Sequence, residues 1–147
     1  MRISGHGLAI DLPTGWEGVI YRRDGGYPVL HAGDFALPAG DGDFGIKAIR
    51  AMSPDGAFAA MTEYDPAIGG RGLFSQVDTP WPLRPTDPAP RAMQRTVPGR
   101  AGLQRFFTAK GRPFCLYFVV GTAGGTAGPV ARANHVLDTI RIAPREG

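Results

Sequence analysis

The fold is decided by residues 102–122, which read "GLQRFFTAKGRPFCLYFVVGT". Residues 110–113, "KGRP", separate two β-prone runs, and a short glycine-containing junction of this kind indicates a β-hairpin. In the second run both alternating sets of residues are apolar: Phe114, Leu116, Phe118 and Val120 on one side, and Cys115, Tyr117 and Val119 on the other. Successive side chains of a strand point to opposite faces, so this strand must be covered on both. We therefore predict a central strand with a packed layer on each face of its sheet.

One covering layer is visible in residues 128–140, "GPVARANHVLDTI". Pro129 suits the first turn of a helix, and apolar residues recur after it at spacings of three and four. The stripe consists of Val130, Ala133, Leu137 and Ile140, while Arg132, His135 and Thr139 fall on the opposite side. This pattern predicts an amphipathic helix of about three turns that packs on the sheet. Residues 141–144 are expected to form a short final strand or a tail.

The opening segment predicts a strand–turn–strand unit. Leu8, Ile10 and Leu12 alternate with smaller or polar residues, which is the period of a half-buried strand. Pro13 and Gly15 supply turn chemistry, and residues 16–23 resume as a second strand. We expect the two strands to form a hairpin, with Trp16 as its apolar anchor.

The middle of the chain predicts shorter elements and one long connection. Strands are expected at 29–37 and 57–65, while residues 46–52 fit either a helix or a strand, and we favour the helix. Five prolines lie between residues 80 and 90, which excludes a regular helix or an interior strand there. We therefore predict a single domain over residues 1–147, with a proline-rich surface connection at 80–100.

Together these elements predict the α+β class, a mainly antiparallel sheet with helices packed on its faces. The segments "GLAIDLPTGW", "RPFCLYFVVG" and "VLDTIRI", in this order, resemble the PsbP-like fold family. That family includes the photosystem subunit PsbP, the Ran-binding Mog proteins and actinobacterial relatives. The resemblance implies an α/β/α sandwich and a non-catalytic docking or assembly role. The chain departs from the family in its proline-rich connection and in lacking an export signal, and no Ran-contacting or metal-ligating position is carried over.

Composition restricts the class of protein further. With 43% hydrophobic residues the chain is globular, and 22 glycines with 14 prolines indicate many turns. The single cysteine, Cys115, excludes an intrachain disulfide and a cysteine-based metal site. The N-terminus has no signal peptide, and no stretch approaches the roughly 20 apolar residues of a membrane span. From these two observations we expect a soluble, cytoplasmic protein. Basic residues that are mostly arginine are typical of a GC-rich bacterial genome, so we expect a bacterial source.

Charge is segregated along the chain. Residues 1–83 carry six basic and ten acidic groups, whereas residues 84–112 carry seven basic groups against Asp87 alone. A partner could be another bacterial protein, or a second copy of the chain meeting the acidic half. An aromatic residue ringed by arginines is typical of interface cores, which predicts a protein-binding surface formed by Trp81, Arg84, Arg95, Arg105 and Arg112. The alternatives are a merely solvated surface and, less favoured, a nucleic-acid interface.

The residues that could carry chemistry show no catalytic or metal-binding pattern. His6, His31 and His135 lack any local signature of a nucleophile and base. Asp41 and Asp43 resemble the start of a calcium loop without its distal glutamate, and Cys115 lies in the most apolar stretch. The glycine-rich residues 121–128 lack the lysine of a phosphate-binding loop. We therefore predict no catalytic residue, no metal and no cofactor.

Two functions follow as hypotheses. The first is a non-enzymatic docking or assembly module. The second is a small-ligand-binding protein or small enzyme with a pocket between sheet and helix, in which His31 or the group of Asp41, Asp43, Glu63 and Asp65 would have to converge.

Overall fold

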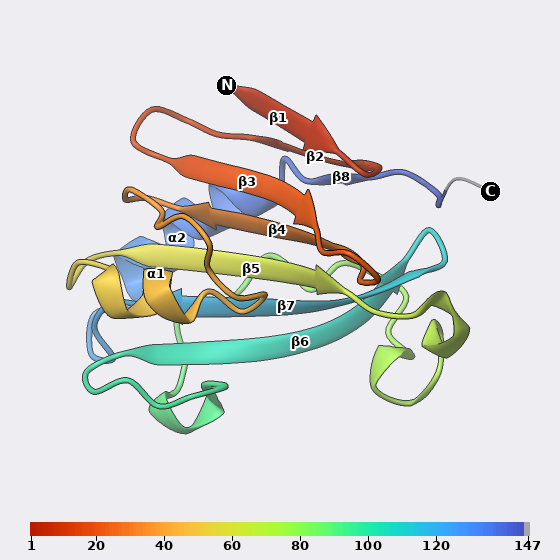
Figure 1. The fold of residues 1–147 in the computed structure, drawn as a ribbon. Coiled ribbons are helices and arrows are strands. Elements are labelled where there is room, and N and C mark those ends of the chain that lie inside the picture. Colours follow the sequence, from red (N-terminus) through yellow and green to blue (C-terminus); the bar gives the residue numbers. More distant parts are fainter. Residues whose placement is uncertain (146–147) are drawn as a thin grey trace.

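The computed structural model describes residues 1–145 and has the predicted α+β class, with two antiparallel sheets and two α-helices in that range (Figure 1). The five-stranded sheet has the order β3-β4-β5-β7-β6, and the three-stranded sheet has the order β1-β2-β8. The strands are β1 (Arg2–Gly5), β2 (Leu8–Asp11), β3 (Glu17–Arg22), β4 (Pro28–Gly33), β5 (Ala57–Glu63), β6 (Ala101–Ala109), β7 (Arg112–Val120) and β8 (Arg141–Ile142). The helices are α1 (Ile46–Ala51) and α2 (Ala127–Leu137), with short 3-10 turns η1 (Pro66–Ile68), η2 (Gly72–Phe74) and η3 (Pro90–Ala92).

The prediction of a central strand covered on both faces is confirmed. Every residue of β7 is buried, and β7 lies between β5 and β6. Lys110 and Gly111 form the two-residue turn of the β6–β7 hairpin, with φ angles of 53° and 74°. Alternate residues of β7 enter two separate apolar clusters, one under α2 and one under α1. We call the two sides of the sheet the α2 face and the α1 face.

The α2 face is covered as the helical stripe predicted. Val130, Ala133 and Leu137 are buried against the sheet, and the helix ends at Leu137, with Ile140 buried just beyond it. The three-stranded sheet adds Leu8 and Ile10 to the same cluster. In Figure 1, α2 lies behind the five-stranded sheet and α1 in front of it.

Residues 46–51 form a helix, as the sequence analysis favoured. Residues just before them supply the hydrogen-bond acceptor that caps the helix N-terminus. The Asp41 carboxylate accepts hydrogen bonds from the backbone N–H groups of Lys47 (3.0 Å) and Ala48 (2.9 Å), two donors without a helical partner. Gly45 precedes the helix with φ of 70°, and a Cβ there would lie 2.2 Å from the Phe58 ring. Only glycine combines this backbone conformation with such a close approach.

The predicted N-terminal hairpin is wrong. Strands β2 and β3 belong to different sheets: β2 pairs with β1 and β8, whereas β3 pairs with β4. The strand at Arg2–Gly5 was missed, although His6 and Gly7, with φ of 53° and 75°, form a two-residue turn that joins it to β2. The hydrophobic period of a strand does not show which neighbour it pairs with. Here β2 forms its hairpin with β1, not with β3.

Strand β4 ends at Gly33, four residues before the predicted end at 37. The Asp34 carboxylate accepts from the backbone N–H of Ala57 at 2.9 Å, and the chain then leaves the sheet. Phe35 and Leu37 pack instead on the α1-face cluster. The difference arises because those half-buried side chains pack over the sheet and do not form part of a strand.

The proline-rich connection wraps around the edge strand β6. Leu83 is buried on the α2 face, where its backbone exchanges two hydrogen bonds with the Asn134 side chain of α2, at 2.7 and 2.8 Å. Ala89 then pairs with Gly102 of β6, and Met93 is buried on the α1 face. The connection thus passes from one face of the sheet to the other.

Candidate functional site

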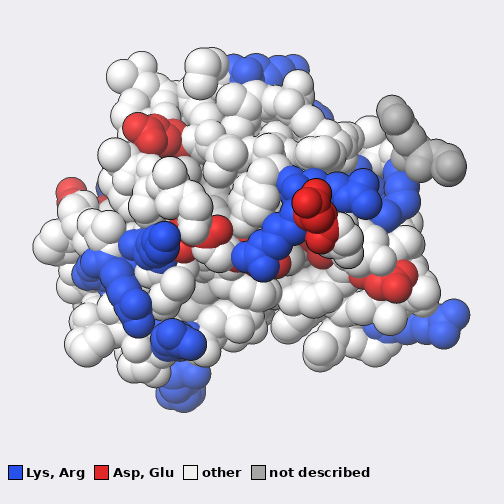
Figure 2. Space-filling model, in the orientation of Figure 1, with Lys and Arg blue, Asp and Glu red and all other residues white. Residues whose placement is uncertain are grey.

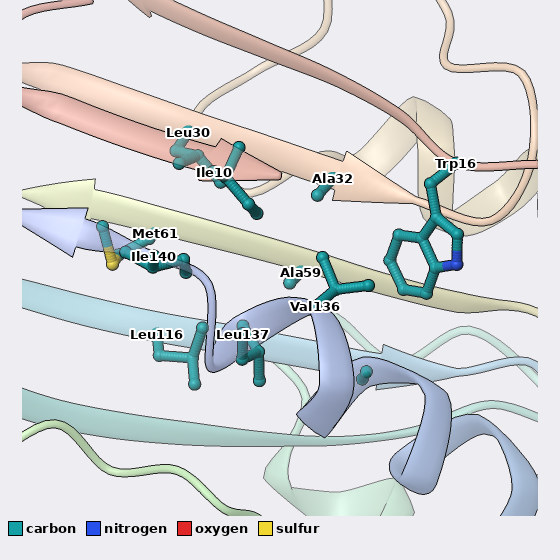
Figure 3. Close-up of a pocket in the computed structure, with 11 residues that line it drawn as sticks. Ile10, Trp16, Leu30, Ala32, Ala59, Met61, Leu116, Val136, Leu137 and Ile140 are labelled. Atoms are coloured by element: carbon teal, nitrogen blue, oxygen red, sulfur yellow. The ribbon is translucent and has the colours of Figure 1, made fainter. Parts of the chain in front are cut away.

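The two faces of the five-stranded sheet differ in the size of the cavities between the sheet and the segments that cover it. On the α2 face the cavity beneath the helix has a volume of only about 10 Å³, and apolar side chains alone line it. Figure 3 shows Val136, Leu137 and Ile140 closing over Leu30, Met61 and Leu116 of the sheet. A cavity of this size and lining is too small for a ligand and offers no partner to a water molecule. The α2 face therefore serves as core.

The predicted contact surface is divided between the two faces. Trp81 packs edge-on against Phe107, with ring centroids 5.8 Å apart, and belongs to the α2-face cluster. Arg105 follows the same alternation as Leu103 and Phe107 and lies 3.7 Å from the Asp87 carboxylate. Arg84 is exposed next to the Leu83 contact with α2. These three residues share the α2 side of the molecule.

Arg112 does not lie on a contact surface, because its side chain is only 3% exposed. Its guanidinium group makes five hydrogen bonds at 2.7 to 3.3 Å: two to the Glu63 carboxylate and three to the backbone carbonyls of His6, Gly7 and Ala143. Arginine has five N–H donors, so none remains for a ligand. Arg112 ties the three-stranded sheet and the C-terminal segment to the end of β5.

Arg95 lies apart from all of these, in a groove on the α1 face. This Arg95 groove has a volume of about 270 Å³ and runs between α1 and the segment after η3. Its lining is Gly42, Asp43, Phe44, Gly45, Ile46, Ile49, Gln94, Arg95 and Tyr117. Tyr117 is 1% exposed, and its hydroxyl accepts the Gln94 backbone N–H at 2.9 Å, which fixes the wall that carries Arg95.

Basic side chains gather around this groove. Figure 2 shows lysine and arginine side chains over α1 and over the η3 segment, at one end of the α1 face. Arg50, which follows the groove-lining Ile49 in α1, and Arg91 of η3 are exposed. Asp43, the carboxylate that lines the groove, lies 3.0 Å from the Arg23 guanidinium and is neutralised by it. Within residues 1–145, Arg50, Arg91 and Arg95 make no ion pair with an acidic side chain.

A second groove lies on the other side of the segment that leads into α1. This His31 groove has a volume of about 420 Å³. It is lined by Glu17, Gly18, Val19, Tyr21, His31, Leu37, Pro38, Ala39, Gly40 and Asp41. His31 of β4 is 3% exposed, and Val19 of β3, its partner in the strand register, is 43% exposed. The sheet thus presents a buried imidazole and an uncovered aliphatic side chain to the same depression.

His31 is held as a neutral ring. Its Nε2 lies 2.9 Å from the Asp43 carbonyl oxygen, and its ring contacts Tyr21 and Phe58 edge-on. Burial lowers the pKa of His31 below the ordinary value of 6.5, because the charged form loses its hydration. Burial also raises the pKa of Tyr21 to about 12, and the nearby Asp43 carboxylate adds to this shift. Both rings therefore remain uncharged at neutral pH.

The other candidate groups are dispersed. Glu63 is enclosed with Arg112 and also contacts Arg145, Asp65 accepts the Ala67 backbone N–H at the start of η1, and Asp41 caps α1. Cys115 is fully buried, and burial raises the pKa of its thiol to about 12, so it is not a nucleophile. The part of the chain that the structure describes contains no cluster of three or more His, Cys, Asp or Glu placed to hold a metal ion. Nor does it contain a helix long and apolar enough to cross a bilayer.

Exposed aliphatic side chains also gather around η1 and η2. Ile68, Leu73 and Val77 are 41%, 68% and 69% exposed. None of these three side chains lines the cavity beneath α2, the Arg95 groove or the His31 groove. This segment offers apolar contact without a feature that selects a partner.

The sequence pointed to Arg95 and His31 but missed their surroundings. Tyr21, Phe44 and Tyr117 become groove residues only once β3, β4 and β7 take their places in the sheet. In the sequence each of them reads as an ordinary strand or loop aromatic. No local motif distinguishes them, because the grooves join residues far apart in the chain.

Comparisons with family models, curated proteins and solved structures find no match to this chain. The PsbP-like resemblance therefore stays a prediction.

Proposed function

We propose that this chain is a non-enzymatic docking module that binds an acidic segment of another protein in the Arg95 groove. The observation that carries the proposal is an aromatic and aliphatic floor, formed by Phe44, Ile46 and Tyr117, beside the Arg95 guanidinium group, which has no acidic partner among residues 1–145. Arginine and aromatic side chains dominate the energetics of protein interfaces.

The size and charge of the groove favour this function over small-molecule binding at the same place. Its volume of about 270 Å³ lies below the roughly 300–1,000 Å³ typical of small-molecule pockets, but it accommodates an apolar side chain of a partner. Arg50, Arg91 and Arg95 together attract carboxylates around that side chain. The occupant that fits both features is a peptide segment rich in Asp and Glu with one large apolar residue.

A short synthetic peptide of Asp and Glu with one central Phe tests the proposal. Titration followed by amide resonances should shift the signals of Phe44, Ile46, Arg95 and Tyr117, and added salt should weaken the binding. Arg95→Glu should weaken it about tenfold or more, equivalent to about 1.4 kcal/mol. Arg84→Glu is the matched control, since Arg84 is an exposed arginine on the other side of the molecule.

Two results would overturn the assignment. One is an equal loss of peptide binding in Arg84→Glu and Arg95→Glu, which would indicate a diffuse charge effect. The other is unchanged affinity when the central Phe of the peptide is replaced by Gly, because the apolar floor of the groove would then contribute nothing.

A further inference from the structure

The His31 groove carries an inference that is independent of the docking proposal. It lies on the opposite side of the segment that precedes α1, and it shares no lining residue with the Arg95 groove. Its volume of about 420 Å³ falls within the range of small-molecule sites.

One ring nitrogen of His31, Nδ1, is available to bind a ligand. Nε2 is taken by the Asp43 carbonyl at 2.9 Å, and a carbonyl accepts, so Nε2 carries the proton. In a neutral ring Nδ1 is then a hydrogen-bond acceptor. Nδ1 has no partner within residues 1–145, and no fully buried side-chain nitrogen or oxygen there lacks one, so Nδ1 keeps some contact with solvent, and His31 lines this groove. The groove therefore contains a fixed acceptor at the base of a depression.

The walls of the groove add negative charge and an aromatic ring. The carboxylates of Glu17 and Asp41 line it and accept only backbone N–H groups, from Leu37 at 3.0 Å and from Gly42, Lys47 and Ala48. No lysine or arginine is among the lining residues. Cations also lie near the groove: the Lys47 ammonium is 3.3 Å from the Gly40 carbonyl oxygen, and the charge of Arg23 acts on His31.

We propose that the His31 groove binds a protonated organic amine, which donates a hydrogen bond to Nδ1 of His31 while Glu17 and Asp41 supply the counter-charge. The Tyr21 ring also lines the groove, and an aromatic ring attracts a cation over its face. Val19, Leu37 and Pro38 contact the apolar body of the ligand. The same chemistry is present in a free amine and in the side chain of a partner's lysine.

Calorimetric titration with benzylamine tests the proposal, with benzyl alcohol as the neutral ligand of similar shape. Benzylamine should bind saturably and benzyl alcohol much more weakly, because the alcohol cannot use the carboxylates. Equal binding of the two compounds, or no binding of benzylamine, overturns the proposal. N-acetyl-lysine N-methylamide distinguishes the sources: binding as strong as that of benzylamine indicates a partner's lysine, and weaker binding indicates a free amine.

Two substitutions locate the ligand. Glu17→Gln keeps the acceptor for the Leu37 N–H but removes the charge, and should weaken benzylamine binding about two- to fivefold. Asp24→Asn, an exposed carboxylate in the turn before β4, is the control and should leave the affinity unchanged. An equal effect of both substitutions would place the amine outside the groove. His31→Leu should abolish binding, and if that variant does not fold, Glu17→Gln decides alone.

Binding should also weaken as the pH falls into the range where His31 becomes protonated, because Nδ1 then changes from acceptor to donor. The charged and titratable groups around His31 are Arg23, Asp41, Asp43, Tyr21 and, across the groove, Glu17. Benzylamine affinity that stays constant while the His31 ring nitrogens report protonation would overturn the role given to Nδ1.

Discussion

The two faces of the five-stranded sheet are built from the same strands but have different uses. On the α2 face the helix, the three-stranded sheet and the start of the proline-rich connection leave a cavity of about 10 Å³ without polar lining. On the α1 face a six-residue helix and a loop cover only the middle, which leaves grooves of about 270 and 420 Å³ on its two sides. The α2 face is closed core, whereas the α1 face keeps two open grooves.

The two faces differ because the helices that cover them bury different numbers of apolar side chains. Helix α2 has eleven residues and buries five of them, whereas α1 has six residues and buries Ala48 and Ile49. A short helix cannot fill the width of a five-stranded sheet, so polar and half-buried side chains complete the α1 face. Buried His31 and Tyr117 therefore lie beside open space, while Leu116 and Phe118, their counterparts on the other side, are enclosed.

The largest effect is expected at the end of the α2 face, where Glu63 holds Arg112. Glu63→Gln leaves the guanidinium group of Arg112 buried without its counter-charge, and should lower the free energy of unfolding by about 3–5 kcal/mol. Urea denaturation measures this loss. Asp24→Asn, which removes an exposed carboxylate, should change stability by less than about 0.5 kcal/mol. A loss below about 1 kcal/mol in Glu63→Gln would mean that the backbone carbonyls alone hold Arg112.

A matched pair of truncations compares the two faces directly. Leu116→Ala, on the closed face, should lower the free energy of unfolding by about 2–5 kcal/mol, because the site cannot collapse. Ile46→Ala removes a half-buried side chain that lines the Arg95 groove, and should lower the free energy of unfolding by less than about 1 kcal/mol. Thermal and urea unfolding of both variants check the difference. Similar losses in the two would contradict the division into a closed and an open face.

The smallest effect is a pH dependence that comes from His31. Its folded pKa is lowered, so between that value and the ordinary 6.5 the unfolded chain binds a proton that the folded chain does not. The free energy of unfolding should therefore fall as the pH drops below about 6.5, by at most about 1.4 kcal/mol per pH unit. His31→Gln should flatten this slope relative to the wild type. Parallel pH profiles for the two proteins would show that His31 is not held neutral.

Much of the fold could be predicted because its strongest signals are local. The β6–β7 hairpin, the burial of β7 and the apolar stripe of α2 each depend on residues that lie close together in the sequence, within one hairpin or one helix. The pairing of β2 was predicted wrongly because alternation is equally compatible with either neighbour. The early end of β4 could not be foreseen either, since it depends on the contact between Asp34 and Ala57, 23 residues apart.

The candidate site was predicted only in fragments. Arg95 was chosen as one member of a basic segment, but the sequence could not show that Arg112, seven residues beyond Arg105, is buried with Glu63. Charge density along a chain does not report exposure. Arg105 lies on β6 and Arg112 on β7, so the position of one says nothing about the exposure of the other. Only the packed sheet shows which arginine side chain is buried and which can contact a partner.

By itself the sequence determined that β7 is covered on both faces, because both alternating sets of residues 114–120 are apolar, which leaves no other stable arrangement. It also determined the class of the fold and the helix that closes one face. Only the tertiary structure decided that the other face stays grooved, because the open space depends on how far α1 and its loop reach across the sheet. That distance is set by contacts between segments remote in the chain, such as the one between Gly45 and Phe58, which no local pattern records.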